Sequence, residues 1–176
     1  MLARIIVFIA LLSSASVVHA QARPTGERAG DLKIGGGFST ANSDYGDRYN
    51  GGAAYFDFDF RPHLGVEGEF HFVKDPSDLY EKTYEVGGRY FRTYKKRWVP
   101  YAKVMYGRGV FNFPPLEDGF RANLAYNLIA AGVGADYKAK PWLYVRADWE
   151  YQKWFSFQNS SLSPSILTVG AAYRFR

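Results

Sequence analysis

The chain has 176 residues, 18% of them aromatic, with no cysteine and a formal net charge of +5. The lack of cysteine excludes a disulfide framework and a lipid anchor attached through cysteine. The length fits one domain with a core of its own.

The first twenty residues have the three parts of a secretory signal. A basic start precedes the apolar run Ile5–Leu12, and small residues lead to Ala20, after which we expect cleavage, with Ala22 as the alternative position. The apolar run is too short to cross a bilayer as a helix, which needs about 20 residues. We therefore expect an exported protein.

The signal peptide, residues 1–20, is expected to be followed by a flexible leader over residues 21–30 and one folded domain over residues 31–176. An exported chain rarely meets nucleic acid, so no nucleic acid partner is expected. The basic charge instead favours an anionic membrane surface, or no specific partner at all.

Eight segments of the domain alternate with a period of two residues, which indicates β-strands. Long polar loops follow the odd segments and short basic turns follow the even ones. Antiparallel strands joined in this way form an up-and-down meander, and eight strands can close into a barrel without exposed edges. The predicted strands are Leu32–Ser39, Gly51–Phe60, Leu64–Val73, Thr83–Tyr94, Trp98–Phe113, Ala125–Tyr137, Trp142–Phe155 and Ser165–Arg176.

Each predicted strand has one apolar face and one charged, glycine-rich face. In Tyr55–Phe60, for example, Phe56 and Phe58 alternate with Asp57 and Asp59. The apolar face carries too many large aromatics for the narrow interior of eight strands, so we place it against lipid. The fold class is therefore all-β, an eight-stranded antiparallel up-and-down transmembrane β-barrel. The alternative is a secreted two-sheet sandwich with its charged face in solvent.

Aromatic residues near the strand ends match the girdles that flank the apolar band of membrane barrels. In such barrels short turns lie on the periplasmic side and long loops outside, which places both ends of the mature chain in the periplasm. The expected girdle residues are Phe60, Tyr94, Trp98, Tyr137, Trp142 and Phe175.

The charged face predicts an interior network of ion pairs, because unpaired buried charges cost several kcal/mol. Midpoints of loops suggest that Lys33 pairs with Asp57 and that Glu67 pairs with Arg89. Four carboxylates on the two sides of the first short turn could alternatively form an acid/base pair or a divalent-cation site: Asp57, Asp59, Glu67 and Glu69. The predicted network comprises Lys33, Asp57, Asp59, Glu67, Glu69, Glu85, Arg89, Lys103, Asp136, Arg146, Asp148, Glu150 and Arg174.

The sequence predicts neither catalysis nor a cofactor. After the signal peptide, His63 falls in a short turn and His71 in a strand without a serine nearby on its face, so no nucleophilic triad is predicted. The basic turns, Lys95-Lys96-Arg97 and Lys138/Lys140, either contact anionic headgroups or are ordinary solvated turns. The long loops could bind a partner or simply cap the barrel through Tyr45, Arg48, Tyr49, Tyr80, Phe120 and Arg121.

From about Leu32 to Arg176 the chain resembles the OmpA-like or opacity-type outer-membrane barrels of Gram-negative bacteria. The resemblance rests on the signal peptide, the eight segments and the stretches WVPYAKVMYGRG, IAAGVGADY and ILTVGAAYRFR. Chains of this family typically end on an aromatic residue that the assembly machinery recognises. Here Arg176 follows that aromatic and departs from the pattern. The resemblance implies a C-terminal assembly signal formed by Val169, Ala171, Tyr173 and Phe175.

These observations predict a non-enzymatic integral outer-membrane protein with a charged, largely filled lumen. It would support the structure of the outer membrane, and it could also act as a small or gated pore. The alternative function is a cell-surface adhesin or ligand-binding barrel that acts through its four outer loops. Expected partners are outer-membrane lipids, lipopolysaccharide and the assembly machinery, and the barrel is expected to be a monomer.

Overall fold

The computed structural model describes residues 30–43, 48–76, 79–112, 123–157 and 160–175. The expected signal peptide, the leader before Gly30, and Tyr45, Phe120, Arg121 and Arg176 lie outside these residues. No helix within the described segments is long and apolar enough to cross a membrane.

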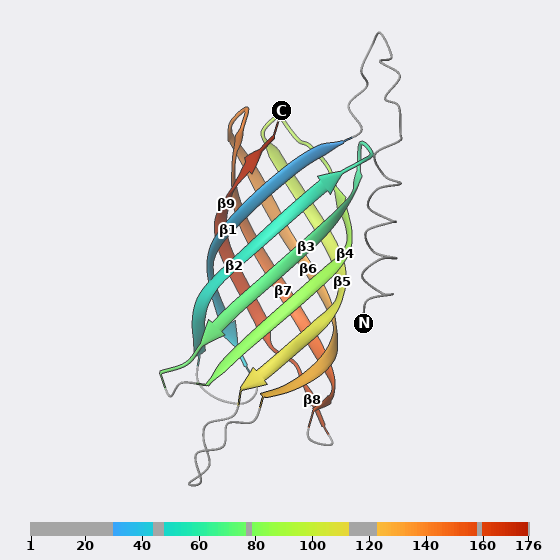
Figure 1. Cartoon of the computed structure of the whole chain (residues 1–176). Coiled ribbons are helices and arrows are strands. Elements are labelled where there is room, and N and C mark those ends of the chain that lie inside the picture. The colour runs from blue at the N-terminus through green and yellow to red at the C-terminus, as the bar shows by residue number, and fades with distance from the viewer. Residues whose placement is uncertain (1–29, 44–47, 77–78, 113–122, 158–159, 176) are drawn as a thin grey trace, which may run out of the picture.

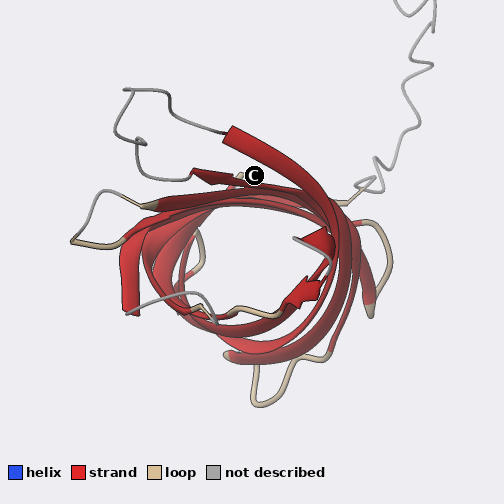
Figure 2. Ribbon diagram, turned by 90° about the horizontal axis from the view of Figure 1, so that it is seen from below, coloured by secondary structure: helices blue, strands red, loops and turns tan. Residues whose placement is uncertain are grey.

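The described residues form nine antiparallel strands, eight of which close into one ring (Figures 1 and 2). Strands β1 to β7 are neighbours in sequence order, and β9 closes the ring between β7 and β1. The predicted eight-stranded meander is confirmed, and a two-sheet sandwich is wrong. The strands are β1 Asp31–Asn42, β2 Arg48–Asp59, β3 Leu64–Lys74, β4 Tyr80–Phe91, β5 Trp98–Asn112, β6 Asn123–Lys140, β7 Leu143–Phe157, β8 Ser160–Leu162 and β9 Ser165–Arg174.

The two ends of the barrel differ. The three short turns lie at one end together with both described ends of the chain, and the strand ends that the longer connections join lie at the other (Figure 1). We call these the turn end and the loop end. At the loop end β8 pairs with the last residues of β7, within a stretch that the alternation predicted to be a loop. Three residues are too few to show a period.

The predicted register is right in the first hairpin and wrong in the loop-connected pair β3 and β4. Lys33 lies opposite Asp57, as expected. Glu67 lies opposite Gly87, and Arg89 lies opposite Gly65. The connection between β3 and β4 is centred one residue earlier than the loop composition suggested, and that displacement moves the pairing by two residues.

The apolar face of the strands points outward, as predicted. Val104 in the middle of β5 is 63% exposed, whereas its neighbours Lys103 and Met105 are buried. Phe56 and Phe58 likewise lie outside, and Asp57 between them is buried. A barrel with this inverted distribution is stable where the outer face meets hydrocarbon. The expected girdle residues Phe60, Tyr94, Trp98, Trp142 and Phe175 are exposed, and Tyr137 is partly exposed.

The turn between β4 and β5 has an unusual backbone. Lys95 and Lys96 have φ values of 48° and 61°, and the amide of Arg97 donates to the carbonyl of Tyr94 at 3.1 Å. Two successive residues with positive φ are the requirement of a type I′ turn, which usually holds Asn-Gly. Side chains other than glycine pay about 1–2 kcal/mol each for this conformation.

Candidate functional site

The strongest candidate for a functional region is the lumen, because alternation directs most charged residues of the strands into it. Most of the predicted network residues are buried there. Buried carboxylates outnumber buried lysines and arginines, so each cation is shared among several acids.

Two arginines organise the network near the turn end. Arg146 donates to Asp57 at 2.6 Å and to Asp136 at 2.8 Å. Arg89 donates to Asp136 at 2.6 Å and also forms an ion pair with Asp57. Lys33 reaches from β1 to Asp57 at 3.3 Å. Strands that are not neighbours in the barrel, such as β2 and β7, are therefore joined across the lumen by ion pairs.

One ammonium group lies at the centre of the next layer. Lys103 Nζ contacts Asp148 at 2.9 Å, Glu150 at 3.0 Å and Glu67 at 3.2 Å, and it also pairs with Glu69. Glu69, Asp148 and Glu150 have oxygens close enough to hold a metal ion. Because Lys103 contacts all three, its charge occupies the position in which a cation would be bound.

A histidine lies beside this layer. His71 Nε2 is 3.1 Å from Glu69, and Nδ1 is 3.2 Å from the hydroxyl of Thr83 and 3.6 Å from Glu85. A serine, Ser39, hydrogen-bonds Thr168 at 2.8 Å, and Thr168 lies 3.5 Å from His71. These groups are fully buried, and a substrate would have no access to them.

Aromatic rings, which the sequence analysis did not assign to the lumen, cover the arginines. The guanidinium of Arg89 lies 4.0 Å from the centre of the Tyr101 ring, and that of Arg146 lies 4.1 Å from the centre of the Tyr55 ring. Both contacts have the geometry of cation–π interactions. A Cβ at Gly134 would lie 2.5 Å from the Tyr101 ring. Interior glycines thus make room both for aromatic rings and for charged side chains, since a Cβ at Gly132 would lie 2.7 Å from the side chain of Lys103.

The loop-end half of the lumen is filled by an apolar cluster that the sequence analysis also missed. We call it the apolar plug. Trp154 is its largest member, and its ring lies against Gly109. Tyr49, predicted to belong to a binding loop, is instead completely buried in the plug, whereas Arg48 beside it is exposed. The plug comprises Ala41, Tyr49, Val73, Met105, Phe111, Leu128, Ala130, Trp154, Leu162 and Ile166.

Gln152 connects the two halves. Its amide nitrogen donates to Glu85 at 2.7 Å and to Glu150 at 2.9 Å, and its oxygen accepts from Trp154 Nε1 at 2.8 Å. The buried indole N–H of Trp154 is therefore satisfied by a group that also belongs to the polar network.

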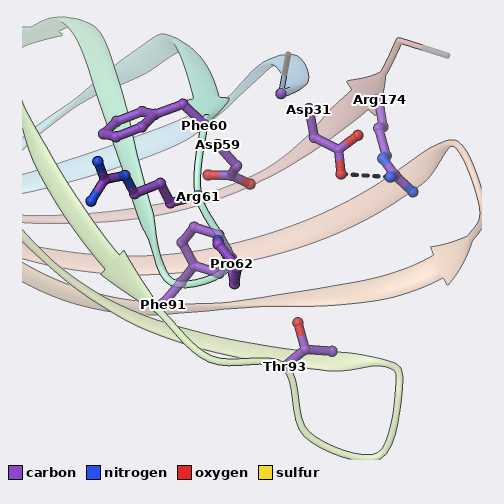
Figure 3. A pocket seen from close by; sticks show the side chains of 9 residues that line it. Asp31, Asp59, Phe60, Arg61, Pro62, Phe91, Thr93 and Arg174 are labelled. Carbon is purple, nitrogen blue, oxygen red and sulfur yellow. Dashed lines mark hydrogen bonds and ion pairs between the residues drawn. The ribbon is translucent and has the colours of Figure 1, made fainter. Parts of the chain in front are cut away.

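At the turn end the lumen opens into a pocket of about 540 Å³, shown in Figure 3. Arg174, predicted to reach the interior network, pairs here with Asp31 at 2.5 Å and is partly exposed. That prediction was wrong because Asp31 lies closer to Arg174 along the same rim. Asp59 also lines the pocket, and it pairs with Lys33 at 2.9 Å.

The predicted C-terminal signal lies on the outer face of β9 and just beyond it. Val169, Ala171, Tyr173 and Phe175 are all exposed. The rings of Tyr173 and Phe175 pack edge to face, with centres 5.0 Å apart.

The chain is similar to known membrane barrels. Residues 8–175 match the family described as the outer membrane protein beta-barrel domain. No curated protein sequence is significantly similar to the chain. Solved structures under 25% identical share the fold.

Three such structures illustrate the likeness. The attachment invasion locus protein Ail of Yersinia pestis is 20% identical, with a TM-score of 0.63 over 84% of this chain and 100% of that one. Neisserial surface protein A is 14% identical, with a TM-score of 0.68 over 84% and 98%. The N-terminal barrel of Pseudomonas aeruginosa OprF is 9% identical, with a TM-score of 0.63 over 83% and 99%.

Proposed function

We propose that this chain, which belongs to the outer membrane β-barrel domain family, is a non-enzymatic, non-conducting barrel that supports the structure of the outer membrane. Its place in the outer membrane follows from the family and the closed barrel. The non-conducting role is our proposal. In it, the side chains that fill the lumen stiffen the barrel and leave no path for ions.

The observation that carries the proposal is the filling of the lumen by two consecutive layers. Ion pairs around Arg89, Lys103 and Arg146 occupy the turn-end half, and the apolar plug occupies the loop-end half. An eight-stranded barrel has an interior just wide enough for its side chains. Crossing it would require a hydrated ion to displace Trp154 and to separate shared ion pairs.

Recording across planar bilayers tests this function. The purified barrel should give no large, stable current steps at voltages at which an open porin conducts. Large stable steps from the wild-type protein would contradict the filled lumen and would favour an open pore.

The distribution of exposed charge supports lipopolysaccharide as a partner. No exposed side chain among the described strand residues is acidic, whereas Arg48, Lys74, Arg108 and Lys153 are exposed near the loop end. Arg108 and Lys153 each follow, two residues along the strand, an exposed tyrosine (Tyr106, Tyr151). Basic groups at this edge of the apolar band suit the phosphates of the outer leaflet.

Lipopolysaccharide binding offers a direct test of this partner. The paired change Arg108→Gln and Lys153→Gln should weaken binding to lipopolysaccharide micelles but not to a dephosphorylated form. Equal binding of both forms by the wild-type protein would speak against phosphate recognition.

A second candidate is a surface adhesin. One structural neighbour is Ail in complex with the heparin analogue sucrose octasulfate, which shows a barrel of this fold bound to a polyanion. The exposed Arg48 and Lys74 flank two loops of the present chain. Shortening the four loops should abolish adhesion while heat-modifiable migration, a sign of the closed barrel, is kept. Adhesion that survives the shortening would exclude this role.

We further propose that the barrel is a monomer and that the assembly machinery recognises the outer face of β9. Phe175→Ala should lower the amount of folded protein in the outer membrane without preventing folding into vesicles. Phe155→Ala, a change at another exposed phenylalanine, is the matched control. Equal losses would show that the position of the aromatic is irrelevant.

A further inference from the structure

Two of the three short turns share a sequence pattern that the proposed function does not use. In both, a tyrosine precedes basic residues and a tryptophan follows them: Tyr94-Lys95-Lys96-Arg97-Trp98 and Tyr137-Lys138-Ala139-Lys140-Pro141-Trp142. Neither stretch contains an acid. The third turn, Arg61-Pro62-His63, has one arginine and no tryptophan after it.

These two turns form one surface. The amide of Lys138 donates to the carbonyl of Arg97 at 2.8 Å, and the rings of Trp98 and Tyr137 lie 4.9 Å apart. A hollow of about 190 Å³ separates the basic side chains. We define the turn patch as Lys95, Lys96, Arg97, Lys138 and Lys140, of which all except the partly buried Lys138 are exposed.

Aromatic contacts fix the height of the turn patch in the membrane. Lys140 Nζ lies 5.2 Å from the centre of the Trp142 ring, and Arg97 donates to the hydroxyl of Tyr137 at 3.3 Å. Trp98 and Trp142 are exposed on the outer face. Such aromatics sit at the level of lipid headgroups, so the basic groups beside them lie among headgroup phosphates.

The backbone of the first turn supports a role for the lysines themselves. Lys95 and Lys96 occupy two positions with positive φ that asparagine and glycine would adopt with less strain. Strained backbone positions tend to persist where the side chain has a task. Two adjacent lysines therefore occupy the tip of this turn although its backbone conformation favours asparagine and glycine.

We propose that the turn patch binds the phosphate of an anionic phospholipid, of which phosphatidylglycerol is the simplest, in the leaflet at the turn end. The hollow admits the phosphate, and the surrounding ammonium and guanidinium groups supply its charge partners. A lipid is favoured over a soluble polyanion because Trp98 and Trp142 bring its acyl chains to the same place. This site is separate from the lumen, and its test does not depend on the plug.

Lipid binding at the turn patch can be measured through the fluorescence of the tryptophans beside it. Trp154 is completely buried in the plug, so a Trp149→Phe background leaves Trp98 and Trp142 as the exposed tryptophans of the described residues, both at the turn end. The protein is folded into phosphatidylcholine vesicles with a minor fraction of brominated phosphatidylglycerol or, in parallel, of brominated phosphatidylcholine. Bromine quenches nearby tryptophan fluorescence, so the ratio of the two signals gives the local enrichment of the anionic lipid.

The test variant removes all five charges of the turn patch by combining Lys95→Asn, Lys96→Gly, Arg97→Gln, Lys138→Gln and Lys140→Gln. The first two changes remove charge while supplying the residues that the turn prefers, so the variant should fold. The wild-type protein should enrich phosphatidylglycerol at least about fivefold, the gain expected from a single basic group, and the variant should bring the ratio near one. The enrichment should also fall in high salt.

A matched control removes the same charge from the loop end: Arg48→Gln, Lys74→Gln, Lys82→Gln, Arg108→Gln and Lys153→Gln. It should leave the turn-end ratio unchanged, and heat-modifiable migration verifies that each variant is folded. Equal quenching by both lipids in the wild-type protein, or enrichment that survives in the test variant, overturns the proposal. If purified peptidoglycan retains the wild-type protein but not the variant, and lipid enrichment is absent, the partner is not a lipid.

Discussion

The two halves of the lumen are built from the same inward-facing positions but are held together differently. Near the turn end the positions carry Arg89, Arg146 and their carboxylates, joined by ion pairs such as those of Arg89 with Asp136 and of Arg146 with Asp57, both at 2.6 Å. Near the loop end they carry the apolar plug around Trp154. Alternation thus decides which way a side chain points and leaves open which kind of interaction fills the space.

The two halves also depend on one another. The plug separates the ions from water at the loop end, and Coulomb attraction is stronger where water is excluded. The network in turn supplies the hydrogen-bond partner of Trp154 through Gln152. Removing a group from one half should therefore have a different effect from removing a group from the other.

The largest effect should come from removing a shared cation. Arg146→Met leaves Asp57 and Asp136 short of a buried partner and should lower the free energy of unfolding by about 3–5 kcal/mol. Reversible urea unfolding from lipid vesicles, followed by tryptophan fluorescence, measures it. Adding Asp136→Asn should recover part of the loss, because fewer charges then lie unpaired.

Arg174→Met is the matched control, since Arg174 pairs with Asp31 at the partly exposed rim. It should cost less than about 1 kcal/mol. A loss as large as that of Arg146→Met would show that the rim and the interior are not distinct electrostatic regions.

Truncating a large side chain of the apolar plug should both destabilise the barrel and open a path for ions through the lumen. Trp154→Ala leaves a cavity and should cost about 3–5 kcal/mol in the same unfolding experiment. In planar bilayers it should also allow small current fluctuations that the wild-type protein lacks. Trp149→Ala, on the lipid-facing side of the same strand, should not change conductance, and equal fluctuations in both variants would refute the plug as the seal.

The outer face gives a third point of comparison, because a charge there meets hydrocarbon. Val104→Arg should lower the free energy of unfolding from vesicles by about 2–4 kcal/mol. Asn127→Arg, also exposed but nearer the loop end, should cost at most about 1 kcal/mol. If both changes are tolerated equally, the outward surface does not contact lipid as the fold implies.

The barrel could be predicted because the alternation around Phe56 and Asp57 is strict and the turns are short. The registers are a different matter, because both were predicted from the midpoints of long loops. The midpoint of the first loop gave the correct pairing of Lys33 with Asp57, whereas that of the second loop displaced the partner of Glu67 by two residues. The centre of a long loop therefore does not fix a register. The plug could have been predicted, because Met105, Leu128 and Trp154 occupy inward-facing positions of their strands. The charged residues of the same face led instead to the prediction of an ion-pair network.

The groupings inside the lumen could not be predicted. Which inward residues share a height depends on the stagger of the strands around the barrel, which alternation does not contain. His71 on β3 therefore lies 3.5 Å from Thr168 on β9, although these two strands are not paired, and no local pattern predicts this contact. The same argument applies to Arg174, whose partner is set by its height at the rim.

The smallest predicted effect distinguishes the hydrogen bond made by an aromatic side chain of the lumen from the packing of its ring against an arginine. Tyr101 donates to Asp148 at 2.7 Å while its ring lies under Arg89, so Tyr101→Phe removes the hydrogen bond and keeps the ring. Asp148 keeps Lys103 as a partner at 2.9 Å, and we expect a loss of about 1–3 kcal/mol in vesicle unfolding. Tyr106→Phe, on the outer face of the same strand, should be neutral. A neutral Tyr101→Phe would mean that the ion pairs satisfy the carboxylates by themselves and that the aromatic layer contributes only its packing against the guanidinium groups.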